Sequence, residues 1–530
     1  RKAPKFFDVV TYSGSSSAQT IAHNLGVTPA MIIVKQLNSS GRWTVYHKDA
    51  SPTGNPENGR VALNTTDQWY EYPGISSFAN LWNQTAPTST HFTVGTDATT
   101  GASGSTYVAY LFAHNNNDGE FGPDSDQDII KCDKYTGGTT GTEVNVGFEP
   151  QFVMFKRTTG SGDWMVFDAM RGVVSDPYPN LDNTLFWNLN NAERTNTGYI
   201  GFTPTGFIHQ GGSGDTNTNG DTYIYMAIRR GPLAAPTDAT KVFTPVLGDG
   251  SGTPSIKTTN HITDFGIAQN KTGGGTVVGT RLLGPRQLKT HTDGAESANS
   301  YFGFDFQNGW HTWTGLNTDY INWNWKRAPS YFDMVIYTGT GSNRTVSHNL
   351  GAVPEMMWIK NREASESWIV YHKALGATKY AMLDKDDADI TNSTRFNNTT
   401  PTASVFTVGT DNSTNSPNSN THVAYLFATV AGVSKVGSYT GNGSDGHIID
   451  CGFSNGARFI LIRLVGTSGS WYIFDTARGI VSGSDPYLKL DTTDAEASSD
   501  LIDPHSSGFI VNNSALINAN GYTHIFYAIA

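Results

Sequence analysis

Short hydrophobic runs separated by polar turns follow one another along the whole chain. In the run YIYMAIR, which begins at Tyr223, alternating apolar positions predict a half-buried β-strand. Comparable runs recur every ~8 to 15 residues, with Gly, Asn, Asp and Ser between them, and no long stripe has the period of an amphipathic helix. The pattern predicts an all-β protein, a tandem array of antiparallel β-sandwich modules of the jelly-roll or lectin-like type, with few and brief helices.

The sequence repeats itself in units of roughly 110 residues. HNLGVTP at His23 returns as HNLGAVP at His348, and WTVYHK at Trp43 returns as WIVYHK at Trp368. A related type of unit follows each of these, because DWMVFDAMRGVVS at 163–175 returns as SWYIFDTARGIVS at 470–482. We call the two types A and B modules. Their preserved order and spacing indicate the internal duplication of an A–B pair.

A fainter, B-like module separates the two pairs. The predicted modules are the first A module (1–114), the first B module (115–232), a degenerate middle module (233–327), the second A module (328–428) and the second B module (429–530). The middle module ends in NWNWKRAP and runs directly into the second A module, and the chain itself opens on the similar string RKAP. We therefore expect a module of the middle type ahead of residue 1.

Composition supports the β interpretation and narrows the expected partners. Charged residues make up 15% of the chain, which suits strands and polar turns better than helices rich in Glu and Lys. The net charge of −11 repels a phosphate backbone, so nucleic acid is not an expected partner. No stretch approaches the ~20 consecutive apolar residues that span a bilayer, so membrane insertion is not expected either. The spacing of Cys132 and Cys451 gives no support for a disulfide between them.

Several strings resemble modules of a known kind. FFDVVTY at Phe6, HNLGVTP at His23, FTVGTD at Phe92 and SYTGNGSDG at Ser438 look like modules repeated in tail-fibre and other structural proteins of marine bacteriophages, which often lie beside SPRY-like or lectin-like β-sandwiches. The resemblance covers nearly the whole chain. It implies a virion structural protein, a tail fibre or adhesin in an extracellular appendage. It supplies no catalytic residues, so we do not expect an enzyme.

The same resemblance implies the partners. They are other virion proteins and a host cell-surface polysaccharide or glycan, and appendages of this kind usually self-associate, often as trimers. Linked modules turn individually weak glycan contacts into strong attachment. Two alternatives stay open: a head-decoration or other purely structural virion subunit, and a capsule-degrading depolymerase, which needs an acid and base pair in a unique cleft.

Histidines that recur in the A modules suggest an imidazole metal site. They are His23, His47, His348 and His372. In the B modules an Asp takes the place of His47, so no fixed set of ligands survives among the copies. A residue present in every copy is expected to serve the shared framework, and we interpret these histidines in that way.

Carboxylates also recur, and pairs of them can act as general acid and base. They are Asp168 beside Arg171, Asp475 beside Arg478, and Glu193, Glu296 and Glu496 in a repeated Ala-Glu dipeptide. Their return in successive modules favours an Arg–carboxylate pair that fixes a loop against the sandwich. We therefore predict no catalytic residues.

The string DTNTNGD matches the opening of a calcium-binding loop. The oxygen donors at alternate positions are Asp215, Asn217, Asn219 and Asp221. The twelfth position is Met226, where such a loop requires a bidentate Glu, so a hairpin between two strands explains the string more simply. Calcium is the one cofactor that the sequence suggests.

One aromatic segment distinguishes the first A module from the second. Between Lys48 and Phe92 lie 43 residues, whereas 32 separate Lys373 from Phe406. The longer segment contains QWYEYPGISSFANLW, in which rings that stack on sugars stand beside side chains that bind hydroxyls. The predicted glycan site comprises Gln68, Trp69, Tyr70, Tyr72, Trp82 and Asn83. A contact with another module or subunit explains the same rings equally well.

Tryptophans outside this segment follow the repeats. Four of them occupy one strand position in the A and B modules, and a fifth aligns with a leucine. They are Trp43, Trp164, Trp368 and Trp471, and Trp187, which aligns with Leu490. A large ring at a repeated apolar position is expected to fill a core, so we predict that all five are buried.

Overall fold

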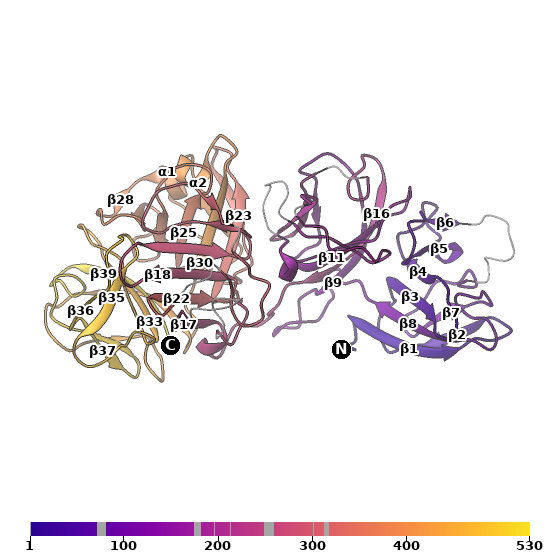
Figure 1. The fold of residues 1–530 in the computed structure, drawn as a ribbon, viewed down its shortest axis with the longest axis horizontal. Coiled ribbons are helices and arrows are strands. Elements are labelled where there is room, and N and C mark those ends of the chain that lie inside the picture. The colour runs from indigo at the N-terminus through magenta and orange to yellow at the C-terminus, as the bar shows by residue number, and fades with distance from the viewer. Residues whose placement is uncertain are drawn as a thin grey trace. The chain divides into compact units, whose positions relative to one another are not determined.

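The computed structural model describes residues 2–71, 81–173, 182–195, 197–211, 214–248, 259–299, 302–311 and 317–530. Strands account for 41% of residues and helices for 3%, and the strands form several separate antiparallel sheets. The predicted all-β array of sandwich modules is therefore confirmed. The chain divides into two compact units, Arg1–Leu233 and Ala234–Ala530 (Figure 1). No helix in the described part is long and apolar enough to cross a membrane.

The first A module has a large sheet and a small one. The large sheet has the order β1-β8-β3-β4-β5-β6, and the small sheet pairs β2 with β7. Phe92 of the small sheet packs edge-on against Tyr12 of the large one, with 6.0 Å between ring centroids. The elements are β1 (Phe7–Ser13), β2 (Gln19–Ala22), β3 (Met31–Gln36), β4 (Trp43–His47), η1 (Pro56–Asn58), β5 (Gly59–Ala62), β6 (Tyr70–Glu71), β7 (His91–Val94) and β8 (Thr106–Phe112).

The first B module repeats this plan. Its large sheet has the order β13-β12-β11-β16-β9, and its small sheet has the order β10-β15-β14. The rings of Tyr135 and Phe207 meet between the sheets at 5.8 Å. The elements are β9 (Ile130–Thr136), β10 (Glu143–Asn145), β11 (Pro150–Arg157), β12 (Met165–Asp168), η2 (Ala169–Arg171), β13 (Leu185–Phe186), β14 (Ile200–Thr203), β15 (Gly206–His209) and β16 (Thr222–Arg229).

A Tyr-Thr-Gly or Tyr-Ser-Gly turn ends the first strand of every A and B module. Each tyrosine hydroxyl donates to a backbone carbonyl in the loop before the closing strand. The pairs are Tyr12 to Thr100 (2.6 Å), Tyr135 to Thr216 (2.7 Å), Tyr337 to Thr414 (2.7 Å) and Tyr439 to Ile517. A Cβ on Gly137 would lie 2.1 Å from the carbonyl oxygen of Thr218, so the close approach of this loop requires the glycine.

The middle module, the first part of the second unit, contributes one four-stranded sheet with the order β17-β22-β18-β19. A small cluster around Trp310 covers one side of this sheet, and Phe302 packs on that ring at 5.5 Å. The elements are η3 (Ala239–Lys241), β17 (Phe243–Leu247), β18 (Phe265–Asn270), β19 (Thr276–Thr280), β20 (Arg286–Gln287), β21 (Ser297–Ala298) and β22 (Tyr320–Trp325).

The second A module has a large sheet with the order β23-β30-β25-β26-β27-β28 and the small pair β24-β29. Its two helices have four residues each, and the side chains of Asn392 and Asp411 cap their first turns. The elements are β23 (Phe332–Thr338), β24 (Arg344–Ser347), β25 (Met356–Asn361), β26 (Ile369–His372), β27 (Lys379–Met382), β28 (Ile390–Thr391), α1 (Ser393–Phe396), β29 (Val405–Val408), α2 (Asn412–Asn415) and β30 (Thr421–Phe427).

The second B module has a large sheet with the order β31-β39-β33-β34-β35-β36 and a small one with the order β32-β38-β37. The rings of Phe509 and Phe526 pack edge-on between them at 5.5 Å. The elements are β31 (Ser434–Thr440), β32 (His447–Asp450), β33 (Phe459–Leu464), β34 (Tyr472–Asp475), β35 (Asp485–Lys489), β36 (Ala497–Ser499), β37 (Ile502–His505), β38 (Gly508–Val511) and β39 (Thr523–Ile529).

The three large sheets of the second unit share one core. Successive residues of β25 point to opposite sides, so Trp358 enters the shared core while Ile359 lies between the two sheets of its own module. Phe459 from the second B module lies in the same core. Phe265 of the middle module packs against Tyr425 with 4.7 Å between ring centroids. Figure 1 shows β18 and β22 between the large sheets of the second A and second B modules.

The closing strands β16, β30 and β39 are buried on both faces, whereas β8 keeps half-buried residues on one face. YIYMAIR predicts one buried face, but Tyr223 to Ala227 are all buried in β16, as is every residue of β30. The prediction of a half-buried strand is wrong, because the second face packs on a neighbouring module where water was expected. Neighbouring modules within each unit are therefore joined by apolar cores.

The tryptophan prediction is confirmed for three residues and wrong for two. Trp164, Trp368 and Trp471 are each 1% exposed. Trp43 is half-buried and Trp187 is 42% exposed, although Leu490, at the position equivalent to Trp187, is fully buried. The difference follows from the middle module, which packs over Leu490 and donates a hydrogen bond from Thr290 to its carbonyl at 2.6 Å.

Candidate functional site

The aromatic segment of the first A module places two of its rings inside the fold. Trp69 is 6% exposed and Trp82 is 2% exposed. The Trp82 indole donates to the carbonyl of Gly59 at 3.0 Å, and a Cβ on that glycine would lie 2.6 Å from the Trp69 ring. A sugar needs a free ring face on which to stack, so this burial corrects the glycan hypothesis for both residues.

The other predicted members lie on the surface where they are described. Gln68 and Asn83 are exposed, and Tyr70 in β6 is 41% exposed. Tyr72 lies outside the described residues. The extra residues of the first A module do not form one enlarged loop, because they are divided between the segment before β5 and the segment after β6. Ile390 in β28 occupies the position equivalent to Tyr70 and is 38% exposed.

The predicted calcium loop holds its side chains in protein contacts. Asn217 accepts from the backbone N–H of Gly138 at 2.8 Å and donates to the carbonyl of Thr139 at 3.1 Å. Asp221 forms an ion pair with Arg157, and Asp215 accepts from the backbone N–H of Asp163. Asn219 is exposed. These contacts favour the hairpin interpretation. Across the described residues, no group of three or more His, Cys, Asp or Glu side chains is placed to hold a metal ion.

The recurring histidines make the same bonds in both A modules. His23 Nε2 lies 3.2 Å from the carbonyl of Thr88, and its Nδ1 accepts from the N–H of Leu25 at 3.2 Å. His348 repeats both bonds with Thr402 and Leu350, at 3.2 and 3.3 Å. Burial lowers the pKa of each imidazole. These rings act as neutral framework groups, as the repeats predict.

His47 and His372 sit deeper, where each A module meets its B module. His47 Nε2 lies 3.3 Å from the carbonyl of Tyr225 in the first B module, and its Nδ1 accepts from the N–H of Asp49 at 3.2 Å. Because Nε2 donates while Nδ1 accepts, these bonds specify a neutral ring. Burial lowers the pKa of both histidines to about 4.

We expect acid to weaken the fold through these two rings. Between pH 6.5 and about 4 the unfolded chain binds a proton at each imidazole while the folded chain does not, so the free energy of unfolding falls as the pH is lowered through this window. The expected loss is on the order of 3 kcal/mol per histidine. Hydrogen exchange of β4 and β26 across the window measures it. His47→Gln and His372→Gln should flatten the profile, and an unchanged profile in both variants would contradict the assignment.

The recurring Asp–Arg–Glu sets form ion pairs, as predicted. Arg171 pairs with Asp168 and reaches Glu193 at 3.0 Å. In the second B module Asp475 pairs with Arg478 at 2.6 Å, with both side chains at most 1% exposed. Asp475 also accepts from the indole of Trp323 at 3.0 Å, which ties the pair to the middle module. These carboxylates hold loops and neighbouring sheets.

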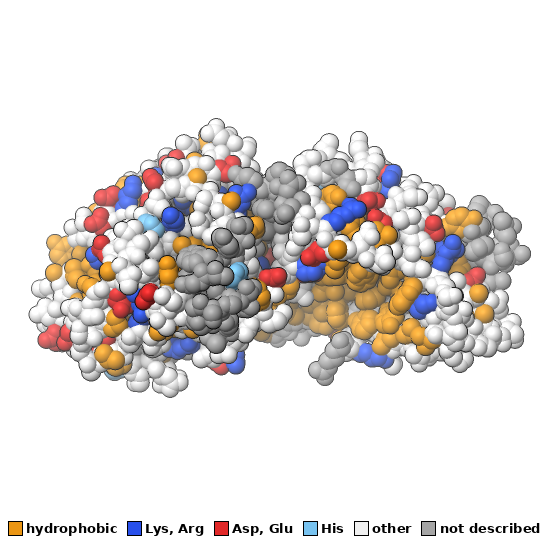
Figure 2. Space-filling model, in the orientation of Figure 1, with side chains coloured by type: hydrophobic (Ala, Val, Ile, Leu, Met, Phe, Trp, Pro, Cys, Tyr) orange, Lys and Arg blue, Asp and Glu red, His pale blue; other side chains and the backbone are white. Residues whose placement is uncertain are grey.

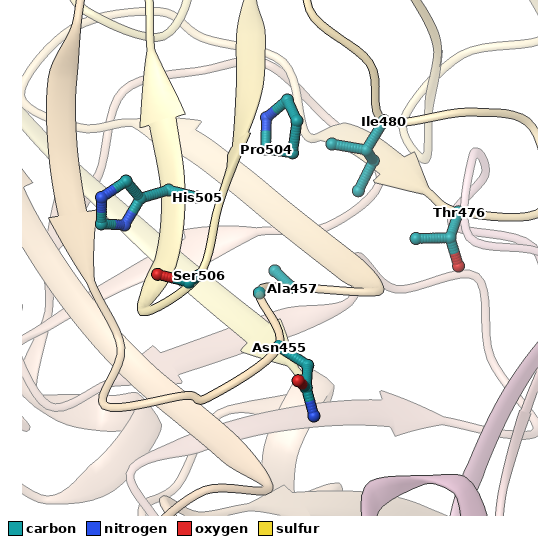
Figure 3. A pocket seen from close by; sticks show the side chains of 8 residues that line it. Asn455, Ala457, Thr476, Ile480, Pro504, His505 and Ser506 are labelled. Atoms are coloured by element: carbon teal, nitrogen blue, oxygen red, sulfur yellow. The ribbon is translucent and has the colours of Figure 1, made fainter.

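Two pockets in the second unit were not predicted from the sequence. One has a volume of about 230 Å³ and is lined by Asn455, Gly456, Ala457, Thr476, Ile480, Pro504, His505 and Ser506. Figure 3 shows the His505 ring on the opposite side of this pocket from Thr476. The other has a volume of about 390 Å³ and is lined by Asp384, Lys385, Asp386, Asp387, Ser470, Lys489, Asp491 and Thr492. Its one sequence signal is the acidic run DKDDAD at 384–389.

Two carboxylates of the acidic pocket belong to the framework. Asp384 and Asp491 accept the backbone N–H groups of Trp368 and Trp471, at 2.9 and 3.0 Å. Burial raises the pKa of both carboxyl groups. In the first unit Asn64 and Asn188 make the same bonds to Trp43 and Trp164, at 3.0 and 2.9 Å. The pocket is therefore lined by carboxylate oxygens and lysine ammonium groups, and two of its carboxylates also hold backbone N–H groups of the fold.

A family model described as "Domain of unknown function (DUF7483)" matches residues 3–232 and 285–530. The chain belongs to this family. The first match coincides with the first A–B pair, and the second covers the second A–B pair together with the last part of the middle module. Searches of curated proteins and of solved structures gave no match.

In both A–B pairs of this DUF7483 chain, the same kinds of hydrogen bond join the B module to the A module. The indole of Trp164 donates to the carbonyl of Ala62 at 2.8 Å, and that of Trp471 donates to Met382 at 2.7 Å. The buried ammonium of Lys156 donates to the carbonyl of Thr66 at 3.0 Å, and desolvation lowers its pKa to about 8. A cation and an indole from each B module thus hold the partner A module in place.

Proposed function

We propose that this protein is a bacteriophage virion structural protein, a tail fibre or adhesin that contacts host surface glycans. One observation carries the proposal: polar residues able to do chemistry make the same framework bonds in each copy, as His23 and His348 illustrate. A repeated rigid scaffold is suited to displaying surface segments that differ between copies. Binding is therefore assigned to surface residues that differ between the copies.

The proposed partners follow from an extracellular appendage. They are other virion proteins and a host polysaccharide or glycan, and the chain is proposed to self-associate, as a trimer in a fibre. Gln68, Tyr70 and Asn83 keep exposed side chains, and the second A module has Ile390 where the first has Tyr70. A phenol ring can stack on a sugar, and the amides of Gln68 and Asn83 can bind its hydroxyl groups.

The glycan proposal is tested on an array with the full chain. Tyr70→Ala should weaken binding by a factor on the order of ten, because an aromatic contact is worth about 0.5–1.5 kcal/mol. Ile390→Ala is the matched control, since Ile390 has the same strand position and nearly the same exposure in the second A module. Equal losses in both variants, or no glycan binding by the parent chain, would count against the proposal.

The same preparation separates adhesion from polysaccharide cleavage. A depolymerase places an acid and a base across the scissile bond, and the recurring carboxylates Asp168 and Asp475 are instead engaged by Arg171 and Arg478. Incubation with host polysaccharide is therefore expected to release no new reducing ends. Steady release would overturn the assignment of a passive adhesin.

A purely structural virion subunit is the second candidate, and a different observation favours it. Trp187 and Leu189 of the first B module are 42% and 38% exposed, beside half-buried Phe152. Clustered exposed apolar side chains mark contacts with other proteins. A head-decoration or other assembly role therefore has support from this surface.

A further inference from the structure

The first A–B pair presents an apolar surface, which we call the outer face. It comprises Phe7, Trp43, Tyr110, Phe112, Phe152 and Trp187, all half-buried or exposed. Within the A module Trp43 and Phe7 stack on Tyr110 at 6.3 and 6.5 Å, and within the B module Phe152 packs on Trp187 at 6.0 Å. Trp43, Tyr110, Phe112 and Phe152 all pack against one buried cluster with members in both modules. Figure 2 shows hydrophobic side chains gathered over this part of the first unit, where β1, β8, β9 and β11 lie.

The second A–B pair has the same face, and there it is covered. The equivalent residues are Phe332, Trp368, Tyr425, Phe427, Phe459 and Leu490, each at most 1% exposed. The strand registers establish the equivalence, since Phe7 pairs with Phe112 as Phe332 pairs with Phe427. The same outer face therefore occurs twice in this chain, partly exposed on the first A–B pair and buried on the second.

The middle module provides the cover in the second unit. Its Phe265 lies 5.5 Å from Phe332, and its Phe243 lies 5.1 Å from Phe459, so it bridges the A and B sheets. Polar bonds fix its register. The carbonyl of its Lys289 accepts from the Trp368 indole at 2.9 Å. In the first unit Trp43 holds the position of Trp368, and its indole has no hydrogen-bond partner among the described residues.

The segment before β1 of the first A module follows the same path as the segment between the middle module and β23. Lys2 pairs with Asp8 at 3.0 Å, as Arg327 pairs with Asp333 at 2.7 Å. The bridge Ala3–Phe7 repeats the bridge Ala328–Phe332, and Lys5 and Ser330 share a left-handed backbone with φ of 59° and 60°. Residues 2–7 of the first pair therefore have the same local structure as residues 327–332, which connect the middle module to the second A module.

We propose that the outer face of the first A–B pair is a docking surface for a third β-module of the kind that residues 234–327 form. The occupant is a sheet that presents aromatic side chains to the face and a backbone carbonyl to the Trp43 indole. The chain supplies the template for this contact, because its own middle module occupies the equivalent face of the second pair. The inference is independent of the proposed glycan contact.

The test adds a third module of this kind to the full chain. A second copy of residues 234–326 is joined ahead of Lys2, which reproduces the connection that leads into Arg327. If the copy docks, amide exchange in β1, β8 and β11 should slow and the binding of a hydrophobic dye to the first unit should be lost. Trp187→Asp in the fusion places an unpaired charge in the contact and should restore both signals. Because Trp187 is 42% exposed, this variant is expected to fold.

Two results would overturn the proposal. One is a fusion whose exchange and dye binding match those of the parent chain. The other is a parent chain in which the face is already protected by a second copy, seen as a concentration-dependent dimer in sedimentation that Trp187→Asp abolishes. A parent chain that stays monomeric and binds the dye, together with a fusion that does not bind it, supports the proposal.

Discussion

Replacing Trp368 with alanine is expected to destabilise the second unit by about 3–5 kcal/mol, the usual cost of removing a buried tryptophan. Trp368 is 1% exposed, and its ring stacks on Tyr425 at 5.9 Å. Its indole N–H donates to the carbonyl of Lys289 in the middle module at 2.9 Å. The substitution therefore leaves a cavity between two modules and an unpaired buried carbonyl.

Trp43→Ala is the matched control. Trp43 has the same strand position and stacks on Tyr110 at 6.3 Å, but it is half-buried and no middle module packs on it. We expect this variant to lose less than half as much stability. Native-state hydrogen exchange resolved by strand is the measurement, since a chain with two compact units does not unfold in one two-state step. Equal losses in the two variants would contradict the assigned role of the middle module.

Repetition made the framework predictable from sequence. Matching strings align the modules residue by residue, and aligned residues make the same bonds, as Arg171 and Arg478 do with their Asp partners. Short apolar runs between turns were enough to identify the strands. These features are local, so they can be predicted from the sequence without knowing which modules pack against each other.

The packing between modules could not be predicted in this way. Trp187 and Leu490 align, yet one is 42% exposed and the other fully buried, because the difference arises from a third module that is distant in the sequence. An apolar strand such as FILIRL in β33 is compatible with one buried face or two. Nothing local distinguishes a sheet that faces water from a sheet that faces another sheet.

The prediction that the rings of Trp69 and Trp82 are available to a glycan is wrong for a related reason. Trp69 and Trp82 stand among Gly, Pro and Asn, which is typical of a surface loop, but both rings turn inward around Gly59. The partner that admits them lies in another strand, and aromatic composition does not reveal it. Exposure is a tertiary property, whereas the chemistry of a side chain can be read directly.

The second large effect is expected at Glu296, the middle module's copy of the repeated Ala-Glu dipeptide. Its carboxylate receives two bonds from the guanidinium of Arg362 in the second A module, at 2.7 and 2.9 Å. The two side chains are 4% and 0% exposed. Glu296→Gln keeps the shape of the side chain but leaves a buried guanidinium without its counter-charge, so we expect a loss of about 3–5 kcal/mol.

The repeats again provide controls for this substitution. Glu193 and Glu496 occupy the same dipeptide in the B modules, but their side chains are 33% and 25% exposed and pair with arginines of their own modules. Glu193→Gln and Glu496→Gln are therefore expected to cost less than about 1 kcal/mol each. Exchange of β22 and β25 measures the contact between modules. If Glu296→Gln costs no more than Glu496→Gln, the ion pair between Glu296 and Arg362 contributes little to holding the middle module on the second pair. A docked module on the first pair would then need no counterpart of Arg362.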